Sequence, residues 1–355
     1  CATMHKTLII ISIILCIYLP LSLLDYNHFP YSDGTEHGAA VRELAKNMAT
    51  PEDPMLANHS GNSPRFVPSI VLMALLMKLL DLDVLVVLKI FSSVYFALFL
   101  IAASLFSKEY FDDPGQVPWS VVSLLFLWGS GWTGANAYMF SALLYTAYFP
   151  SVVSFSLSLL ALYFQLRFLR YNKKGFLVAE ILLGSIAFIN HPLTGIFFFI
   201  CSGLLYIEEK RFDQKTLAQY ALSAGSALLL MLLWPYYSFF ATLLKVATGE
   251  MGQAADYQIT QHYLHSNFLV RSGPALAGIP CIILFLKRKS YLMLTGGFVI
   301  FSLIYLTGYV YKISLTERFV FFIMFSLQLA ASRMCREWFS PLPLQQGTRK
   351  IIASV

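Results

Sequence analysis

The sequence predicts an all-α polytopic membrane protein, and both its composition and the spacing of its apolar runs favour that class. Apolar residues make up 57% of the chain and charged residues 12%, whereas a soluble domain has about 25% charged residues. Apolar runs of helical length alternate with short polar segments, as in chains that cross a bilayer several times. We therefore expect a single transmembrane domain over residues 1–355 and no separate soluble domain.

The basic residues and the cysteines argue against several other classes. The net charge is +6, but Lys and Arg are dispersed in short clusters between apolar runs. This pattern is typical of membrane topology and does not indicate a nucleic-acid partner. The five cysteines form no CxxC pair, so we predict neither a disulfide framework nor a metal site. The chain also has no P-loop motif.

Residues 7–24 form the first predicted span, and a long polar loop follows them. The absence of a small-residue cleavage site after this run favours a retained helix over a signal peptide. The polar stretch 25–65 holds six of the 19 acidic residues and three of the seven histidines. This concentration of carboxylates and imidazoles in an otherwise apolar chain indicates a functional loop.

Two short helices at the membrane surface are predicted within this first extracytoplasmic loop, 25–83. The first begins with Asp33 as its N-cap and Glu36 as the partner in a capping box, and it ends at about Met48. His37, Val41 and Leu44 share one face of it. The second, 67–80, has fourteen residues and covers about 21 Å, which is short of the roughly 30 Å hydrocarbon core. We therefore expect it to be interfacial or re-entrant.

Full-length spans follow this loop. The first of them is 84–106, and the others are 117–134, 151–168, 175–190, 192–207, 217–240, 274–287, 290–308 and 318–334, which makes about ten spans in all. If 67–80 does not cross, Lys and Arg concentrate in the segments that become cytoplasmic, and if it does cross the bias reverses. The positive-inside rule therefore supports the interfacial assignment and an outward-facing acidic loop.

With this topology the unusual residues gather at the outer face. Six of the seven histidines lie there, and His5 is the exception. Tyr148 is placed at the outer rim and His191 in a tight turn before Pro192. The outer loops also carry cationic side chains, namely Arg271, Lys312 and Arg318.

One stretch of the chain is similar to a known family. A first span, an outer loop of the form Asp-x-x-Glu-His-x-x-x-Val-Arg-Glu-Leu and a Pro-led apolar helix resemble the GT-C glycosyltransferases, over roughly residues 7–107. In layout the chain resembles the lipid-A aminoarabinose transferases and the protein O-mannosyltransferases. Many members have a second acid directly after the first, whereas this chain has Gly34 there and its next acid is Glu36.

The resemblance implies a GT-C-like bundle and an activity. Such enzymes move a sugar from a polyprenyl-phosphate carrier to a lipid, glycan or protein acceptor at the extracytoplasmic face, and Asp33 matches the family's catalytic carboxylate. The localisation implied is the cell (inner) membrane, among its lipids. Transfer with inversion needs a carboxylate base, and the departing phosphate needs cations or strong donors.

The candidate residues follow from this chemistry. Asp33 and Glu36 are the candidate catalytic acids, and the candidate substrate contacts are His37, Tyr148, His191, Arg271, Lys312 and Arg318. Structural roles stay open for several of them: Asp33 as a plain cap, Glu36 as a capping-box partner and Tyr148 as part of an interfacial aromatic belt. No cofactor is certain, and a divalent cation is possible, with His262 and His265 three residues apart but without a third ligand.

A membrane transporter or lipid flippase without covalent chemistry is the alternative function. That class places charges near the middle of the membrane and broken helices in paired positions. In this chain the charge is concentrated at one face instead, which favours the enzyme.

Overall fold

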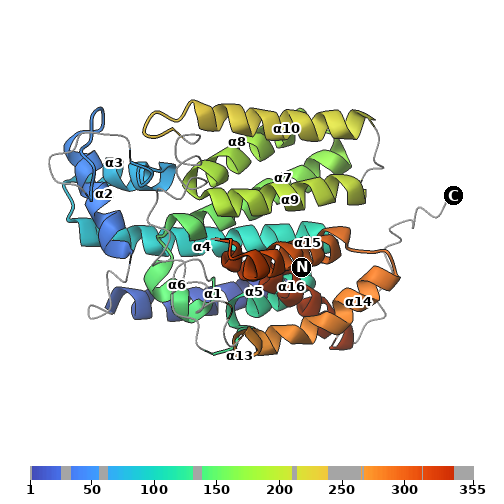
Figure 1. Cartoon of the computed structure of the whole chain (residues 1–355). Helices are drawn as coiled ribbons and strands as arrows, with labels where there is room; N and C mark the ends of the chain where they lie inside the picture. Colours follow the sequence, from blue (N-terminus) through green and yellow to red (C-terminus); the bar gives the residue numbers. More distant parts are fainter. Residues whose placement is uncertain are drawn as a thin grey trace.

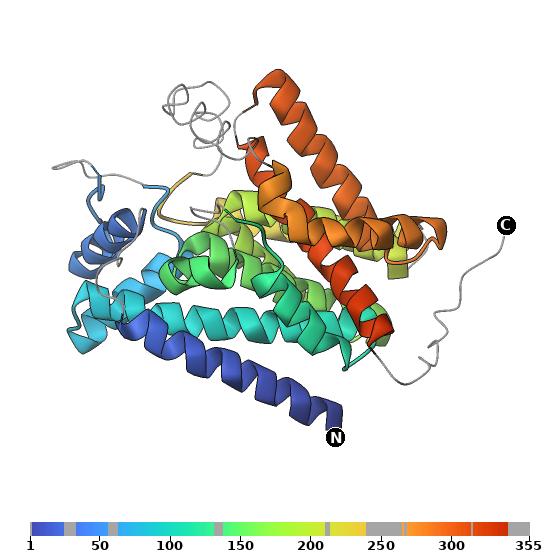
Figure 2. The same cartoon turned by 90° about the horizontal axis from the view of Figure 1, so that it is seen from below.

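The computed structural model describes residues 2–24, 33–55, 63–130, 138–209, 214–238, 265, 268–313 and 315–339. The regular elements in these ranges are helices (Figure 1). Six long helices run side by side along one direction of the molecule: α1 (Ala2–Leu24), α4 (Val84–Phe111), α7 (Pro150–Tyr171), α8 (Lys174–Asn190), α9 (Pro192–Glu209) and α10 (Gln214–Leu232). Figure 2 shows α1 on one flank, next to α4, and α15 (Leu292–Tyr311) on the opposite flank.

Among the residues that the structure describes, six helical segments are long and apolar enough to cross a membrane, so the chain is a multi-pass integral membrane protein. They are Val84–Phe111, Pro150–Tyr171, Pro192–Glu209, Phe268–Lys287, Leu292–Tyr311 and Thr316–Trp338. Each of the six overlaps a predicted span. The other four predicted spans coincide with α1, α5 (Gln116–Phe126), α8 and α10, whose described apolar parts are shorter than 18 residues. The expectation of about ten spans is thus supported for six of them.

Helix α7 lies at the centre of the bundle and contacts α4, α8 and α9. Pro150 occupies its first turn, where the missing N–H is no loss, and Asn172 ends it in the left-handed conformation. Its buried positions include four serines, whose small side chains allow close approach of neighbouring helices: Ser151, Ser154, Ser156 and Ser158. Phe155 on the same helix stacks on Tyr138 and contacts Phe197 and Phe325, so aromatic rings from α9 and α16 (Val320–Trp338) meet on α7.

The two helices predicted within the first loop are present as α2 (Gly34–Lys46) and α3 (Pro68–Leu80). They lie at one end of the bundle, on the left in Figure 1, and we call this the α2 end. At the α2 end α1, α8 and α10 finish, while α4, α7 and α9 begin. The face of α2 that carries His37, Val41 and Leu44 is buried, as its periodicity predicts.

The capping-box prediction for α2 is wrong. Asp33 precedes the helix, but its side chain makes no capping hydrogen bond. Glu36 forms an ion pair with Arg65 instead of reaching back to the N-cap. The physical reason is that a guanidinium is a stronger partner for a carboxylate than a neutral backbone amide, and the fold brings Arg65 to the start of α2.

The opposite end of the bundle is tied by ion pairs. Glu109 of α4 pairs with Arg167 and Arg170 of α7, at 3.4 and 3.2 Å, and Arg170 also reaches Glu209 of α9 at 2.8 Å. Asp113, just after α4, pairs with two arginines of α16, Arg333 at 3.5 Å and Arg336 at 3.1 Å. The two ends therefore differ, since this end has two clusters of acids paired with arginines, whereas the α2 end carries His37 and His191 as well as the Glu36–Arg65 pair.

Candidate functional site

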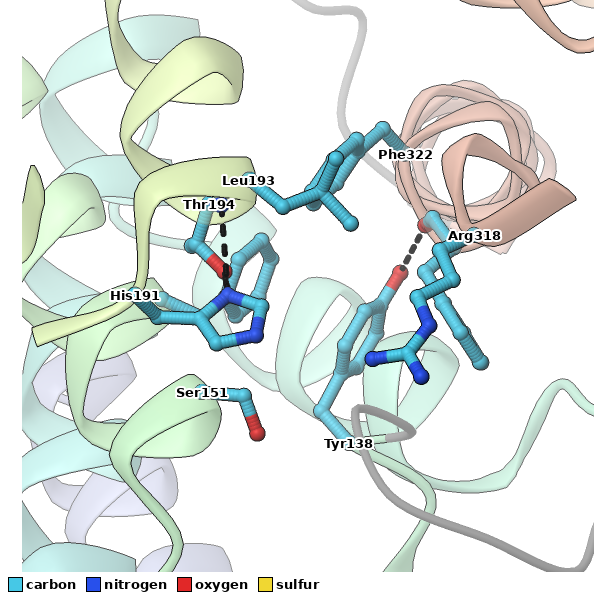
Figure 3. Close-up of a pocket in the computed structure, with 9 residues that line it drawn as sticks. Tyr138, Ser151, His191, Leu193, Thr194, Arg318 and Phe322 are labelled. Atoms are coloured by element: carbon cyan, nitrogen blue, oxygen red, sulfur yellow. Dashed lines mark hydrogen bonds between the residues drawn. The ribbon is translucent and has the colours of Figure 1, made fainter. Parts of the chain in front are cut away.

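A small cavity opens at the α2 end, where α7 and α9 begin and the turn η2 (Thr316–Phe319) leads into α16 (Figure 3). It measures about 10 Å³, which is room for about one water molecule. Nine residues line it: Tyr138, Ser151, Phe155, His191, Leu193, Thr194, Arg318, Phe321 and Phe322. Two of them, His191 and Arg318, are among the predicted site residues.

His191 is held in place by the first turn of α9. It sits between α8 and α9, directly before Pro192, and its Nδ1 lies 2.8 Å from the Thr194 hydroxyl oxygen and 3.4 Å from the Thr194 backbone nitrogen. Because the Thr194 amide can only donate, Nδ1 accepts, and the neutral ring then carries its proton on Nε2. Figure 3 shows this second nitrogen facing the cavity.

The His191 ring is neutral at ordinary pH. Burial has the largest effect on the pKa of His191, and the nearby Arg318 guanidinium and His37 act in the same direction. Together they lower this pKa from 6.5 to about 3. A neutral imidazole whose Nε2–H faces the cavity is a hydrogen-bond donor toward any oxygen bound there.

Arg318 supplies the positive charge of the cavity. It is half-buried in η2, and its guanidinium faces the same space as the His191 ring (Figure 3). Tyr138 lies beside Arg318 in the cavity lining. Its hydroxyl hydrogen is shared between two acceptors, the Phe321 carbonyl oxygen (3.1 Å) and Gln328 Oε1 (2.9 Å). Both bonds fix the Tyr138 ring against α16.

His37 approaches the cavity from α2. Its ring packs edge-on against Phe149, with ring centroids 4.9 Å apart, and more distantly against Tyr148 at 6.5 Å. These two residues directly precede α7, whose first turn gives Ser151 to the cavity. Burial first, and then the positive charge of Arg65, lower the pKa of His37 to about 4, while the charge of Asp33 acts in the opposite direction.

The structure therefore gathers five of the eight predicted site residues around one place. Asp33 and Tyr148 lie next to His37, and His37 is within electrostatic reach of His191, which shares the cavity with Arg318. Glu36 lies close by, but it is engaged with Arg65.

Arg271 and Lys312 are not part of this cavity. Arg271 is buried in α13 (Phe268–Ser272), where its carbonyl oxygen accepts a hydrogen bond from the Gly129 amide at 2.6 Å. Lys312 is an exposed residue in the left-handed conformation at the end of α15. The His265 ring packs on Tyr305 and Tyr309, with ring centroids 4.5 and 5.0 Å apart. His262 lies outside the described residues.

A metal site is not visible in the part of the chain that the structure describes. Within those ranges no three His, Cys, Asp or Glu side chains come together as a metal ion would require. The possible divalent cation thus stays a prediction without a located site.

Two polar residues of the cavity were not singled out from the sequence. Thr194 could have been found from the sequence, because it lies three residues after His191, and residues at that spacing face each other in a helical turn. Ser151 follows Pro150 at the start of α7, but nothing in the sequence relates it to residue 191. A scan of protein-family models and a search of curated proteins gave no match to this chain, so the interpretation of the site rests on its geometry.

Proposed function

We propose that the protein is a membrane glycosyltransferase of GT-C type. It takes a sugar from a polyprenyl-phosphate carrier and passes it to a hydroxyl-bearing acceptor at the extracytoplasmic face. The observation that carries the proposal is the cavity at the α2 end, where Arg318, His191 and Thr194 face one space and where Asp33 directly precedes α2. A cation and neutral donors near a carboxylate are what glycosyl transfer from a phosphate ester needs.

The charge of the cavity favours a carrier with a single phosphate. Arg318 is the one cationic side chain among the nine lining residues, and His191 is neutral because its pKa is about 3. A sugar phosphodiester carries one negative charge, which one guanidinium balances, and the His191 Nε2–H and the Ser151 hydroxyl are donors for its oxygens. Because the cavity has room for about one water molecule here, its walls must move apart to admit the phosphate. A pyrophosphate would bring a second charge for which the described lining has no cation.

In this reaction Asp33 is the general base for the acceptor. Its carboxylate takes the proton from the acceptor hydroxyl while the acceptor oxygen forms a bond to the anomeric carbon of the sugar. The bond between that carbon and the phosphate oxygen breaks, and the polyprenyl phosphate leaves with the electron pair, next to Arg318. A single displacement of this kind inverts the anomeric configuration.

The test uses purified protein in detergent with labelled polyprenyl-phosphate hexose and pentose carriers and a membrane-lipid extract as acceptor. Transfer should release polyprenyl phosphate and label the acceptor. Arg318→Gln should raise the KM for the carrier by about 10- to 100-fold, because a hydrogen bond to a charged group contributes about 1.5–3 kcal/mol. Arg288→Gln is the control and should leave KM unchanged, because Arg288 is an exposed residue just after α14 (Ile279–Lys287) and does not line the cavity.

Two results would contradict the proposal. One is a carrier recovered chemically intact with every sugar tested, and movement of that intact carrier across vesicles would identify a flippase. The other is a normal carrier KM in the Arg318 variant of an active enzyme, which would exclude the cavity as the phosphate site.

A further inference from the structure

The segment that follows α10 joins three separate parts of the α2 end. It contains Trp234, Tyr236 and Tyr237, which we call the aromatic clasp. Each of the three uses its side-chain donor on a backbone carbonyl oxygen far away in the sequence. Every residue has a backbone carbonyl group, so no particular side chain is needed on the accepting residues. The side chains that these three bonds require are those of the clasp.

The first two bonds hold the surface helices. Trp234 Nε1 donates to the carbonyl oxygen of Phe66 at 2.9 Å, just before α3 begins at Pro68. The Tyr236 hydroxyl donates to the carbonyl oxygen of Met48 at 2.9 Å, just after α2 ends at Lys46. The rings also pack. The Tyr236 ring meets Phe66 edge-on, with ring centroids 6.0 Å apart, and it is tilted against Trp234, with centroids 5.6 Å apart.

The third bond holds the clasp to the turn that carries the site. The Tyr237 hydroxyl donates to the carbonyl oxygen of Ile189 at 2.7 Å, two residues before His191. A parallel link runs from α3, because the Ser69 amide donates to Asn190 Oδ1 at 2.9 Å. Ile189, Asn190, Ser69 and Tyr237 are all buried, so water does not compete for these bonds.

From these contacts we propose that Trp234 and Tyr236 are positioning residues for the reaction proposed above. They fix α2, with Asp33 and His37, relative to the turn with His191. The inference rests on the proposed function, because the distance it sets is the one between the acceptor's base and the carrier's phosphate site. A displacement of about 1 Å between reacting groups can reduce a rate by about 10²-fold.

The chain offers a matched control for the test. Tyr220, on α10, donates its hydroxyl to the carbonyl oxygen of Phe199 on α9 at 3.1 Å. This is the same bond chemistry between neighbouring segments, but Tyr220 does not contact α2 or α3 in the described structure. Tyr236→Phe and Tyr220→Phe each delete one hydroxyl and keep the ring, so general loss of stability affects both alike.

Two measurements separate positioning from stability. Tyr236→Phe and Trp234→Phe should lower kcat at least tenfold and leave the KM for the carrier within twofold, whereas Tyr220→Phe should change neither. Hydrogen exchange should show at least tenfold faster exchange of the α2 amides in Tyr236→Phe and unchanged exchange in Tyr220→Phe. The proposal is overturned by normal α2 exchange in Tyr236→Phe, by faster exchange with normal kcat, or by equal loss of kcat in Tyr220→Phe.

The exchange experiment keeps this inference distinct from the proposed function. It needs no substrate, so it reports on the attachment of α2 even if no carrier is turned over. If the wild-type protein has no transferase activity, the proposed function fails and the positioning role fails with it. Faster α2 exchange would then still establish the attachment on its own.

Discussion

The charge states of His37 and His191 decide how the site responds to acid. Both rings are neutral in the folded protein at pH 7, because their pKa values, about 4 and about 3, lie below the ordinary value of 6.5. In the unfolded chain each ring takes up a proton as the pH falls through about 6.5. The unfolded state therefore binds more protons than the folded state between about pH 6.5 and pH 4, and acid favours unfolding.

We expect the contributions of His37 and His191 to the free energy of unfolding to fall as the pH is lowered from 7 to about 4.5. Each such histidine contributes up to about 1.4 kcal/mol per pH unit in this window. His191→Gln removes one of these groups, so its stability should depend less steeply on pH than that of the wild-type protein. Thermal unfolding in detergent at several pH values measures the two slopes, and equal slopes would contradict the neutral, buried imidazole.

Asp33 carries the sharpest prediction at this scale. Asp33→Asn should reduce transfer by about 10²- to 10⁴-fold, the usual contribution of a general base, while expression and thermal stability stay normal. The fold tolerates the change because Asn has nearly the same shape as Asp and is as good an N-cap.

Glu43→Gln is the matched control for Asp33→Asn. It also removes one negative charge from the same helix, where Glu43 pairs with Lys46 on the exposed side at 2.5 Å. Such a surface pair contributes at most about 1 kcal/mol, so this variant should transfer sugar normally. A near wild-type rate in Asp33→Asn would show that another group takes the proton.

At the scale of elements, the α8–α9 pair determines where His191 lies. Gly195, in the first turn of α9, packs directly against Phe188 of α8, and a Cβ at this position would meet both the ring and the Cα atom of Phe188. Ring motion relieves the first contact, but the second is with backbone. The close approach of the two helices around the His191 turn therefore requires glycine at residue 195.

Gly195→Ala should separate α8 from α9 and destabilise the protein by about 1–3 kcal/mol, the usual cost of overpacking. It should also lower transfer, because His191 moves relative to Arg318. Gly225→Ala is the opposite case, since nothing lies within 4 Å of a Cβ in the middle of α10, and it should stabilise by up to about 1 kcal/mol through helix propensity. Thermal unfolding of both variants checks the pair, and similar shifts would contradict the close α8–α9 contact.

For the molecule as a whole, the two ends of the bundle imply an orientation. By the positive-inside rule we expect the cytoplasmic side to hold the basic turn between α7 and α8 and the end of the bundle opposite the α2 end, where arginines pair with Glu109 and Asp113. The α2 end is then expected outside. Figure 1 shows these two ends at opposite sides of the bundle.

Cysteine labelling tests this orientation in intact cells, in a background where the native cysteines are replaced by serine. Ala49→Cys, exposed just after α2, should react with a membrane-impermeant maleimide from outside. Lys173→Cys, exposed between α7 and α8, should react only after permeabilisation. The reverse pattern would invert the topology and with it the extracytoplasmic site.

Several features of the molecule could be predicted from the sequence because they depend on local pattern. The apolar runs indicate a multi-pass membrane protein, and short-range periodicity locates α2, α3 and the buried face with His37, Val41 and Leu44. Counting crossings places Asp33, His191 and Arg318 at the same end of the bundle, where the structure has them. Each of these conclusions needs only the hydropathy of a segment, its periodicity and its length.

Other features depended on which side chains the packed helices turn toward one another. Arg318 faces the cavity, while Arg271 and Lys312, cations in equally polar loops, do not, because the rotation of each helix is set by packing over its whole length. In the same way Glu36 pairs with Arg65 rather than capping α2, and Ser151 and the aromatic clasp meet the His191 turn only in the folded chain. The sequence alone thus determined the membrane class and the end of the bundle where the polar residues gather. The tertiary structure decided the contacts at that end, since contacts between distant residues depend on helix rotation and register, which local periodicity does not encode.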